Sequence, residues 1–481
     1  MDYKIVGFAL GVLLTILGVA ELIPAALEWS MSSAEAGNFF MNSMLCLFFG
    51  VCLILANKSF NREPNIRQAF MLTSISWIFV SAFAALPLYM SNLGISYTDA
   101  FFESMSAITT TGSTVLSRLD SLPYGILLWR SIIQWIGGIG LVAFAILLLP
   151  ALRVGGMQLF QTESSDKSEK LIPRSADIMR HLLVVYTGLT VLCALSFYLE
   201  GMTLFDAINH AMTTIPTGGF STHDASFGYF DSISMRLTAT VFMFISGIPF
   251  ILYIQFFYQK KMTFLQDEQV IVYCSIVFGL TVIMTAWIWN NEPYDFMHSF
   301  SHAIFSIVSI MTTTGYATVD YTVFGTFATM FFFFLTYVGA CAGSTAGGMK
   351  IMRLSIVSKA VSHQINTMIY SRGLFPIRYQ GKAISRPLVN VVLGFSGLYV
   401  LFNVLLTLAL SLIGLDFATA ISGAATAIAN VGPGIGDIIG PAGNFSSLPD
   451  SAKWLLSLGM LIGRLEILTV LVLFTPAYWR F

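Results

Sequence analysis

Long apolar stretches alternate with short polar connections along the whole chain. A helix that crosses a bilayer needs about 20 mostly apolar residues. Ten stretches meet this requirement, at residues 5–26, 39–56, 70–90, 126–149, 182–199, 237–258, 270–289, 323–341, 388–412 and 454–474. The apolar run of the first exceeds the usual 7–15-residue core of a signal peptide, so an uncleaved helix is expected there. The pattern predicts an all-α membrane protein with ten transmembrane helices.

A second pattern recurs four times between these helices. After the third, fifth, seventh and ninth predicted helices comes a shorter, semi-apolar stretch that ends in small polar residues and glycine. The four read SAITTTG at 106–112, TTIPTGG at 213–219, SIMTTTG at 309–315 and TAIANVG at 426–432. Their last glycines stand 107, 96 and 117 residues apart. This indicates four pseudo-symmetric repeats of helix, re-entrant pore loop and helix around one pore, preceded by two extra helices.

The repeats set the expected domain organisation. A two-helix N-terminal extension covers residues 1–66. The four repeats are expected at 67–153, 180–261, 268–362 and 387–481.

The four loop ends have the chemistry of a cation filter. Backbone carbonyl oxygens can replace the water around an alkali cation without trapping it as full carboxylates do. Glycine permits the positive φ and the close backbone approach that such a loop needs. The expected filter residues are Thr110, Thr111, Gly112, Thr217, Gly218, Gly219, Thr313, Thr314, Gly315, Asn430, Val431 and Gly432. The choice between Gly218 and Gly219 stays open, although a 13-residue spacing from Asp206, matching that of Gly112 from Asp99, favours Gly219.

Two interruptions are expected below these loops. The eighth predicted helix runs into Gly343, Ser344, Thr345, Ala346, Gly347 and Gly348, whose three glycines weaken a helix by about 1 kcal/mol each. This segment is interpreted as a flexible plug, with a helix end that has a generous C-cap as the alternative. Arg464 lies near the middle of the last predicted helix and is interpreted as a cationic barrier that faces the pore. The alternative is a structural pair with a distant carboxylate, and Glu466 is an improbable partner because the two side chains point about 200° apart on a helix.

Composition and charge support the membrane assignment. Apolar residues make up 56% of the chain and charged residues only 10%. Nineteen of the 24 lysines and arginines fall on one set of connections and at the termini, so both termini are expected in the cytoplasm. The net charge of −1 gives no field that would attract nucleic acid.

Single polar residues give weaker signals. Glu103, in the first pore helix, either braces the filter from behind or reaches the outer surface. Outer acids would make a negative mouth: Asp120, Asp224, Asp231, Glu292, Asp295, Asp320, Asp416, Asp437 and Asp450. Residues 161–180 carry mixed charge and either dock a partner or form a solvated loop.

As a set, the four Thr/Gly loop ends, the glycine-rich break after the eighth helix and Arg464 resemble the TrkH branch of the Trk/Ktr/HKT superfamily of potassium uptake proteins. The resemblance implies a bacterial inner-membrane homodimer with one pore per subunit, opened by a TrkA-like cytosolic ring that binds nucleotides. It implies K⁺ as the transported ion at the filter residues and no cofactor. It also implies that Gly112, Gly219, Gly315 and Gly432 are the principal filter glycines, that residues 343–348 form the gating loop, and that Arg464 is the gate arginine.

Two other functions compete with a gated channel. A proton- or sodium-coupled symporter would also use broken helices, and His210 could relay protons, although a packed, hydrogen-bonded histidine is the simpler interpretation. An intramembrane aspartyl protease would use Asp437 in its GxGD pattern together with Asp295. It would need both acids inside spanning helices, whereas both fall in outer connections. The chain is therefore not expected to be an enzyme.

Overall fold

The structure is a computed structural model of the 481-residue chain, and it describes residues 3–58, 65–147 and 175–480. Residues 161–174, most of the segment expected either to dock a partner or to form a solvated loop, lie outside the described residues. Regular structure in the described part is almost entirely helical. Its two short strands, β1 (Arg378–Tyr379) and β2 (Lys382–Ala383), pair antiparallel with Arg378 opposite Ala383.

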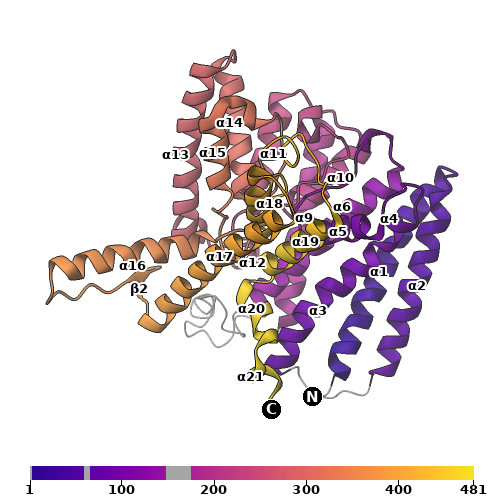
Figure 1. The fold of residues 1–481 in the computed structure, drawn as a ribbon, viewed down its shortest axis with the longest axis horizontal. Coiled ribbons are helices and arrows are strands. Elements are labelled where there is room, and N and C mark those ends of the chain that lie inside the picture. The colour runs from indigo at the N-terminus through magenta and orange to yellow at the C-terminus, as the bar shows by residue number, and fades with distance from the viewer. Residues whose placement is uncertain (1–2, 59–64, 148–174, 481) are drawn as a thin grey trace.

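Two long helices, α1 (Lys4–Ser30) and α2 (Glu35–Ala56), form a hairpin at one edge of the molecule (Figure 1). Small residues let the two helices approach closely, as is usual for helices packed within membranes. Ser43 Oγ donates to the Gly18 carbonyl oxygen at 2.7 Å. The Glu28 carboxylate, fully buried, accepts from the backbone N–H of Gly125 and so ties the hairpin to the helix that begins there.

Most of the remaining helices follow one order four times: a long helix, a short helix and a second helix. The first group comprises α3 (Ile66–Ala84) with α4 (Leu86–Met90), α5 (Tyr97–Ile108) and α6 (Tyr124–Leu147). The second comprises α9 (Ser175–Leu199), α10 (Leu204–Thr214), α11 (Ile233–Ser246) and α12 (Phe250–Gln259). The third comprises α13 (Glu268–Asn291), α14 (Phe296–Met311) and α15 (Gly325–Leu335), and the fourth α17 (Arg386–Leu412), α18 (Phe417–Ala429), α19 (Asp450–Arg464) and α20 (Ile467–Leu471). The domain boundaries expected from the sequence stay predictions.

The four short helices α5, α10, α14 and α18 lie in the interior. From Ala100 to Ile108 every residue of α5 is buried, and α18 is buried from Ala420 to Ala429 except at Ile421. Each helix starts at a side-chain cap, because Ser96, Thr203, Asp295 and Asp416 accept backbone N–H bonds from the first turn. Capping fixes where each short helix begins, so it also fixes where its C-terminal end delivers the following loop.

Two of the predicted spans are bent. The prediction of one helix at 237–258 is wrong: α11 and α12 meet at 88° around Gly247, Ile248 and Pro249. The prediction of one helix at 454–474 is also wrong. There α19 and the segment that continues it to Phe474 meet at 109°, with Glu466 at a φ of 65° in the break. Proline and positive φ are incompatible with a continuous helix.

The count of ten spans stays a prediction. The described residues contain seven helices long and apolar enough to cross a membrane, or up to nine if each bent pair counts as one span. The expected helix at 323–341 is much shorter, because α15 ends at Leu335 and irregular backbone follows as far as Lys350. The fold is that of an all-helical, multi-pass membrane protein.

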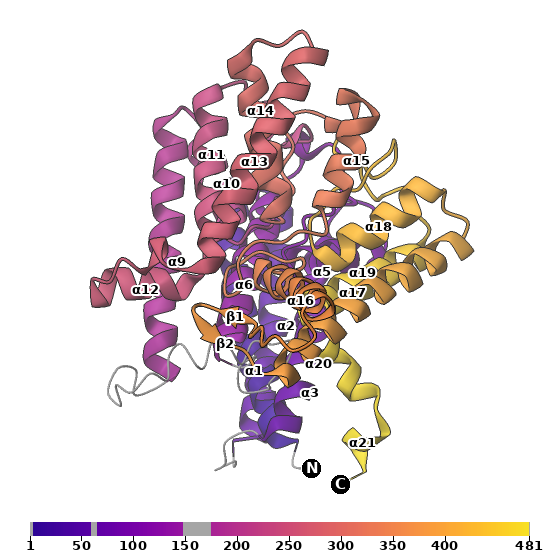
Figure 2. The same cartoon turned by 90° about the vertical axis from the view of Figure 1, so that its left-hand side faces the viewer.

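One element leaves the bundle. The helix α16 (Ile351–Ile369), with the β1–β2 hairpin after it, projects away from the other helices in Figure 1 and points toward the viewer in Figure 2. Both marked chain ends lie at the same end of the molecule in the two views. That end also carries α20 and the short helix α21 (Pro476–Trp479).

Candidate functional site

The loops that follow the four short helices share one backbone conformation. The residue two before the last glycine has a positive φ in every copy: 50° at Thr110, 55° at Thr217, 59° at Thr313 and 57° at Asn430. The glycines themselves have φ of 87° at Gly112, 75° at Gly219, 78° at Gly315 and 108° at Gly432. A positive φ costs a residue with a side chain roughly 1–2 kcal/mol, so four matched copies indicate a shared constraint. The match makes Gly219, not Gly218, the equivalent of the other three glycines.

One hydrogen bond also recurs in all four loops. The backbone N–H of the residue before each glycine donates to the carbonyl oxygen five residues earlier. The distances are 2.8 Å from Thr111 to Ser106, 2.9 Å from Gly218 to Thr213, 2.8 Å from Thr314 to Ser309 and 3.1 Å from Val431 to Thr426. The sequence-level symmetry of the four stretches therefore extends to their backbones, even where the side chains differ.

The four loops close into a ring. A Cβ atom placed on Gly112 would collide with the Gly218 carbonyl oxygen, one on Gly219 with that of Thr314, and one on Gly315 with that of Val431. A Cβ on Gly432 would lie 2.8 Å from the Thr111 carbonyl oxygen, which completes the circle. Only glycine fits at these contacts. The four loops therefore surround a common axis, with one backbone carbonyl of each against the next loop.

Side chains link neighbouring loops of this ring. Ser113 Oγ donates to the Gly432 carbonyl oxygen at 2.9 Å, and Asn430 Nδ2 donates to Thr111 Oγ1 at 2.9 Å. The Tyr316 hydroxyl lies 2.6 Å from Thr213 Oγ1. The fourth loop has Asn430 where the other three loops have threonine. This asparagine donates a hydrogen bond to the first loop, and it tolerates positive φ better than most residues.

Glu103 supports the first loop from behind. Its carboxylate accepts from Thr114 Oγ1 at 2.9 Å and from the Val115 backbone N–H at 2.8 Å, and it pairs with Arg130 Nε at 2.8 Å. Arg130 in turn donates to the Ser221 carbonyl oxygen at 3.0 Å. The bracing role expected for Glu103 is confirmed. The alternative, a surface position, is wrong, since the side chain is fully buried.

The glycine-rich segment 343–348 lies directly against the ring. The Gly347 backbone N–H donates to Thr313 Oγ1 at 2.7 Å, and Thr345 Oγ1 donates to the Ile215 carbonyl oxygen at 3.0 Å. A Cβ on Gly347 would collide with the Ala429 carbonyl oxygen. The alternative of a helix end with a generous C-cap is wrong, because α15 already ends at Leu335 and the backbone from there to the segment is irregular.

Arg464 is buried beside that segment without a partner among the described residues. It stands at the end of α19, not in the middle of a continuous helix as the sequence predicts. It is 3% exposed, and none of its three guanidinium nitrogens has a hydrogen-bond acceptor in the described part of the chain. Glu466 pairs with Arg353, whose guanidinium lies 3.8 Å above the Phe395 ring. The expectation that Arg464 and Glu466 do not pair is confirmed.

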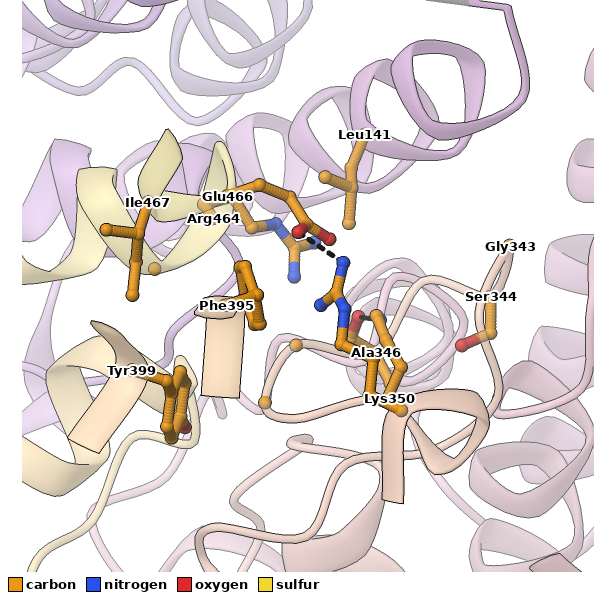
Figure 3. A pocket seen from close by; sticks show the side chains of 14 residues that line it. Leu141, Gly343, Ser344, Ala346, Lys350, Phe395, Tyr399, Arg464, Glu466 and Ile467 are labelled. Atoms are coloured by element: carbon orange, nitrogen blue, oxygen red, sulfur yellow. Dashed lines mark hydrogen bonds and ion pairs between the residues drawn. The ribbon is translucent and has the colours of Figure 1, made fainter. Parts of the chain in front are cut away.

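These groups share one pocket (Figure 3). Its lining includes Gly347, Gly348 and three basic residues, Lys350, Arg353 and Arg464, but Glu466 is its one carboxylate. The Lys350 ammonium donates to the Ala346 carbonyl oxygen. The pocket therefore carries an excess of positive charge next to the loop segment.

Histidines and carboxylates on the side of the ring away from this pocket have hydrogen-bond or ion-pair partners. Partial burial opposes a positive charge on His223 and by itself would lower its pKa. Two carboxylates outweigh this effect and raise the pKa: Asp206 Oδ1 lies 3.5 Å from Nε2, and Asp120 Oδ1 lies 2.5 Å from Nδ1. His210 is packed as the simpler interpretation expected, with Nδ1 2.9 Å from the Asp206 carbonyl oxygen and Nε2 3.0 Å from Ser221 Oγ. Several of the outer acids also have structural partners: Asp231 pairs with Arg236, and Asp320 caps a helical turn.

Sequence reasoning missed several residues at this site. It did not anticipate the partnership of Arg353 with Glu466, because that contact joins α16 to the break after α19. It also gave no role to Gln134, which contacts the second loop from α6. The sequence does mark Gln134, because a polar side chain within a strongly apolar helix usually contacts another polar group inside the protein.

Comparison with known proteins identifies the family. A sequence profile for TrkH, described as a cation transport protein, matches residues 35–480. The Trk system potassium uptake protein TrkH of Vibrio parahaemolyticus is 36% identical over 494 aligned positions, which cover 100% of both chains. This chain belongs to the TrkH family. The Trk system potassium uptake protein TrkI of Halomonas elongata is 48% identical over 415 residues, or 86% of this chain and 84% of that protein.

A solved structure shows the same fold at full length. The crystal structure of the potassium transporter TrkH from Vibrio parahaemolyticus matches with a TM-score of 0.93 and 35% identity, and the match covers 100% of both chains. The family consists of transport proteins, so this TrkH-family chain is not an enzyme. The protease alternative also fails on geometry, because Asp295 caps α14 and Asp437 lies outside any helix, and both are exposed.

Proposed function

We propose that this TrkH-family protein takes up potassium through a gated, channel-like pore that runs along the axis of the four loops. The observation that carries the proposal is the closed ring, in which each principal glycine lies against a backbone carbonyl of the next loop. Related proteins named as potassium uptake proteins and a potassium transporter support K⁺ as the ion.

In this proposal the ring is the selectivity filter. The carbonyl oxygens of the four loops replace the water that a potassium ion sheds. The short helices direct their partially negative C-terminal ends toward the ring, which favours cations over anions. K⁺ would bind at Thr110, Thr111, Gly112, Thr217, Gly218, Gly219, Thr313, Thr314, Gly315, Asn430, Val431 and Gly432. A protein with this function needs no resident cofactor, because the backbone supplies the ligands.

The gate in this proposal is the segment 343–348 together with Arg464. The segment contacts two of the loops and would obstruct the path directly beneath the filter. The unpaired guanidinium of Arg464 would repel a cation that arrives there. Both features would have to move for conduction.

The assembly is proposed from the family resemblance. We propose a homodimer in a bacterial inner membrane, with both termini in the cytoplasm and a TrkA-like cytosolic nucleotide-binding ring that withdraws the gating segment. The projecting α16 fits a role in assembly, because it exposes the apolar side chains of Ile365 and Met368. Nucleic acid is not a proposed partner.

Flux through purified protein in liposomes tests the proposal. Rubidium uptake should follow the potassium potential alone and should exceed sodium uptake. A chain that moves no rubidium, or moves sodium equally well, would contradict the potassium pore. Uphill accumulation driven by a proton or sodium gradient would instead establish the alternative, a coupled symporter with the same architecture.

A further inference from the structure

The second loop of the ring lacks an internal brace that the first and third loops have. In the first loop Thr109 Oγ1 lies 2.8 Å from Thr111 Oγ1, and in the third loop Thr312 Oγ1 lies 2.8 Å from Thr314 Oγ1. These hydroxyls stand three residues and one residue before the principal glycine. In the second loop the same positions hold Pro216 and Gly218, so no such hydroxyl bridge can form.

The side chain of Gln134 contacts the second loop where this hydroxyl bridge is missing. It comes from α6, in the preceding group of helices, and its side chain is fully buried. Its Nε2 donates to the Gly218 carbonyl oxygen at 2.7 Å, and its Oε1 accepts from the Phe220 backbone N–H at 3.2 Å. One amide therefore holds the backbone on both sides of Gly219.

Gly218 is glycine because of Gln134. Its φ lies outside the positive region that favours glycine, unlike that of Gly219. The three atoms nearest to a Cβ placed on Gly218 all belong to the Gln134 amide, at 2.5 to 2.8 Å. The nearest obstacle to a side chain at position 218 is therefore the Gln134 amide.

The contact also singles out one carbonyl of the ring. Among the four carbonyls that lie against neighbouring glycines, those of Thr111, Gly218, Thr314 and Val431, that of Gly218 alone has a hydrogen-bond donor in the described structure. A bonded carbonyl is fixed in position, and one of its lone pairs is occupied. Both effects change how well it replaces water around an ion of a given size.

We propose that Gln134 is a specificity-determining residue that positions the second loop and tunes its Gly218 carbonyl for the larger alkali cations. The proposal rests on the proposed function, because it assigns a role within that filter. Gln134 acts through the loop backbone and is a positioning residue.

The test compares Gln134→Met with Asn403→Leu as a matched control. Met keeps the length of the side chain but removes both hydrogen bonds. Asn403 is also a buried amide, but its side chain donates only to the Tyr399 carbonyl oxygen of its own helix. In liposomes, Gln134→Met should lower the rubidium-to-sodium flux ratio roughly fivefold, the factor expected from the loss of the bond to the Gly218 carbonyl alone. Asn403→Leu should leave the ratio unchanged.

A rescue experiment distinguishes tuning from general damage. Gly218→Thr alone should reduce rubidium flux, because the new side chain collides with Gln134. The double variant Gln134→Ala with Gly218→Thr should recover flux, since the space for the threonine is then free. An unchanged ratio in Gln134→Met, or no recovery in the double variant, would overturn the assignment. If the unmodified protein conducts rubidium selectively, either result overturns only the role of Gln134 and leaves the proposed function intact. If the unmodified protein does not conduct rubidium, the proposed function itself is contradicted.

Discussion

Two buried arginines lie on different sides of the ring and have opposite surroundings. Arg130 is 2% exposed and Arg464 is 3% exposed. Arg130 pairs with Glu103, donates to the Ser221 carbonyl oxygen and lies 4.1 Å above the Phe220 ring. Arg464 has no acceptor in the described structure and shares its pocket with two further basic residues.

The same residue type therefore stands in two different electrostatic environments, one neutralised and one not. A paired, hydrogen-bonded charge fixes the groups around it, and the Arg130 pair ties the first loop to the second. An unpaired buried charge costs free energy and is retained only where its field has a use. We infer that the Arg130 side is a scaffold and that the Arg464 side is a switch.

Removing Glu103 should break the scaffold and gives the largest expected effect. Glu103→Ala leaves Arg130 buried and unpaired, so the free energy of unfolding should fall by about 3–5 kcal/mol. Thermal unfolding in detergent measures the change. Asp231→Asn is the control, because Asp231 also pairs with an arginine, Arg236, but its side chain is 96% exposed. That pair should contribute no more than about 1 kcal/mol. Equal losses in the two variants would contradict the scaffold role.

Removing the unpaired charge tests the switch. Arg464→Ala should raise rubidium flux roughly tenfold or more, because a unit charge a few ångströms from the path opposes a cation by a few kcal/mol at an effective dielectric constant of about 20. Arg464→Lys keeps the charge and should conduct like the unmodified protein. A similar rise in both variants would show that side-chain shape, not charge, forms the barrier.

A methyl group in the segment 343–348 tests whether that segment belongs to the gate. Gly347→Ala places a Cβ against the Ala429 carbonyl oxygen, so the segment should leave its position under the ring. Rubidium flux should rise severalfold in the liposome assay. Gly140→Ala in α6 is the matched control, because nothing lies within 4 Å of the added Cβ. Unchanged flux in Gly347→Ala would remove the segment from the gate.

The smallest expected effect concerns pH on the scaffold side. The raised pKa of His223 means that its ion pairs contribute fully below the usual histidine pKa of about 6.5 and are lost as pH rises through the raised value. The Asp120 side chain is half exposed and the contact with Asp206 is long, at 3.5 Å, so the contribution should stay below about 1 kcal/mol. Thermal stability should therefore decline slightly above pH 6.5 in the unmodified protein and stay flat in His223→Asn. A decline of the same size in both would assign it to another group.

Much of this site could be predicted from the sequence because its signals are local or repeated. The glycine-ended stretches recur in one slot, and Asp99 and Asp206 gave the register that the φ of Gly219 supports. The bends at Gly247 and Glu466 could not be predicted from the hydrophobic pattern alone, since long apolar runs flank both breaks. Side-chain partners such as Arg353 with Glu466 depend on tertiary contacts between distant elements, and spacing carries no information about them.

The most direct test of the proposed filter is a crystal structure with rubidium in place of potassium, in which anomalous scattering locates the ion. We expect an ion peak on the axis of the four loops, within coordination distance of carbonyl oxygens of residues 110–112, 217–219, 313–315 and 430–432. An ordered rubidium site elsewhere along the helices, with none at this ring, would contradict it.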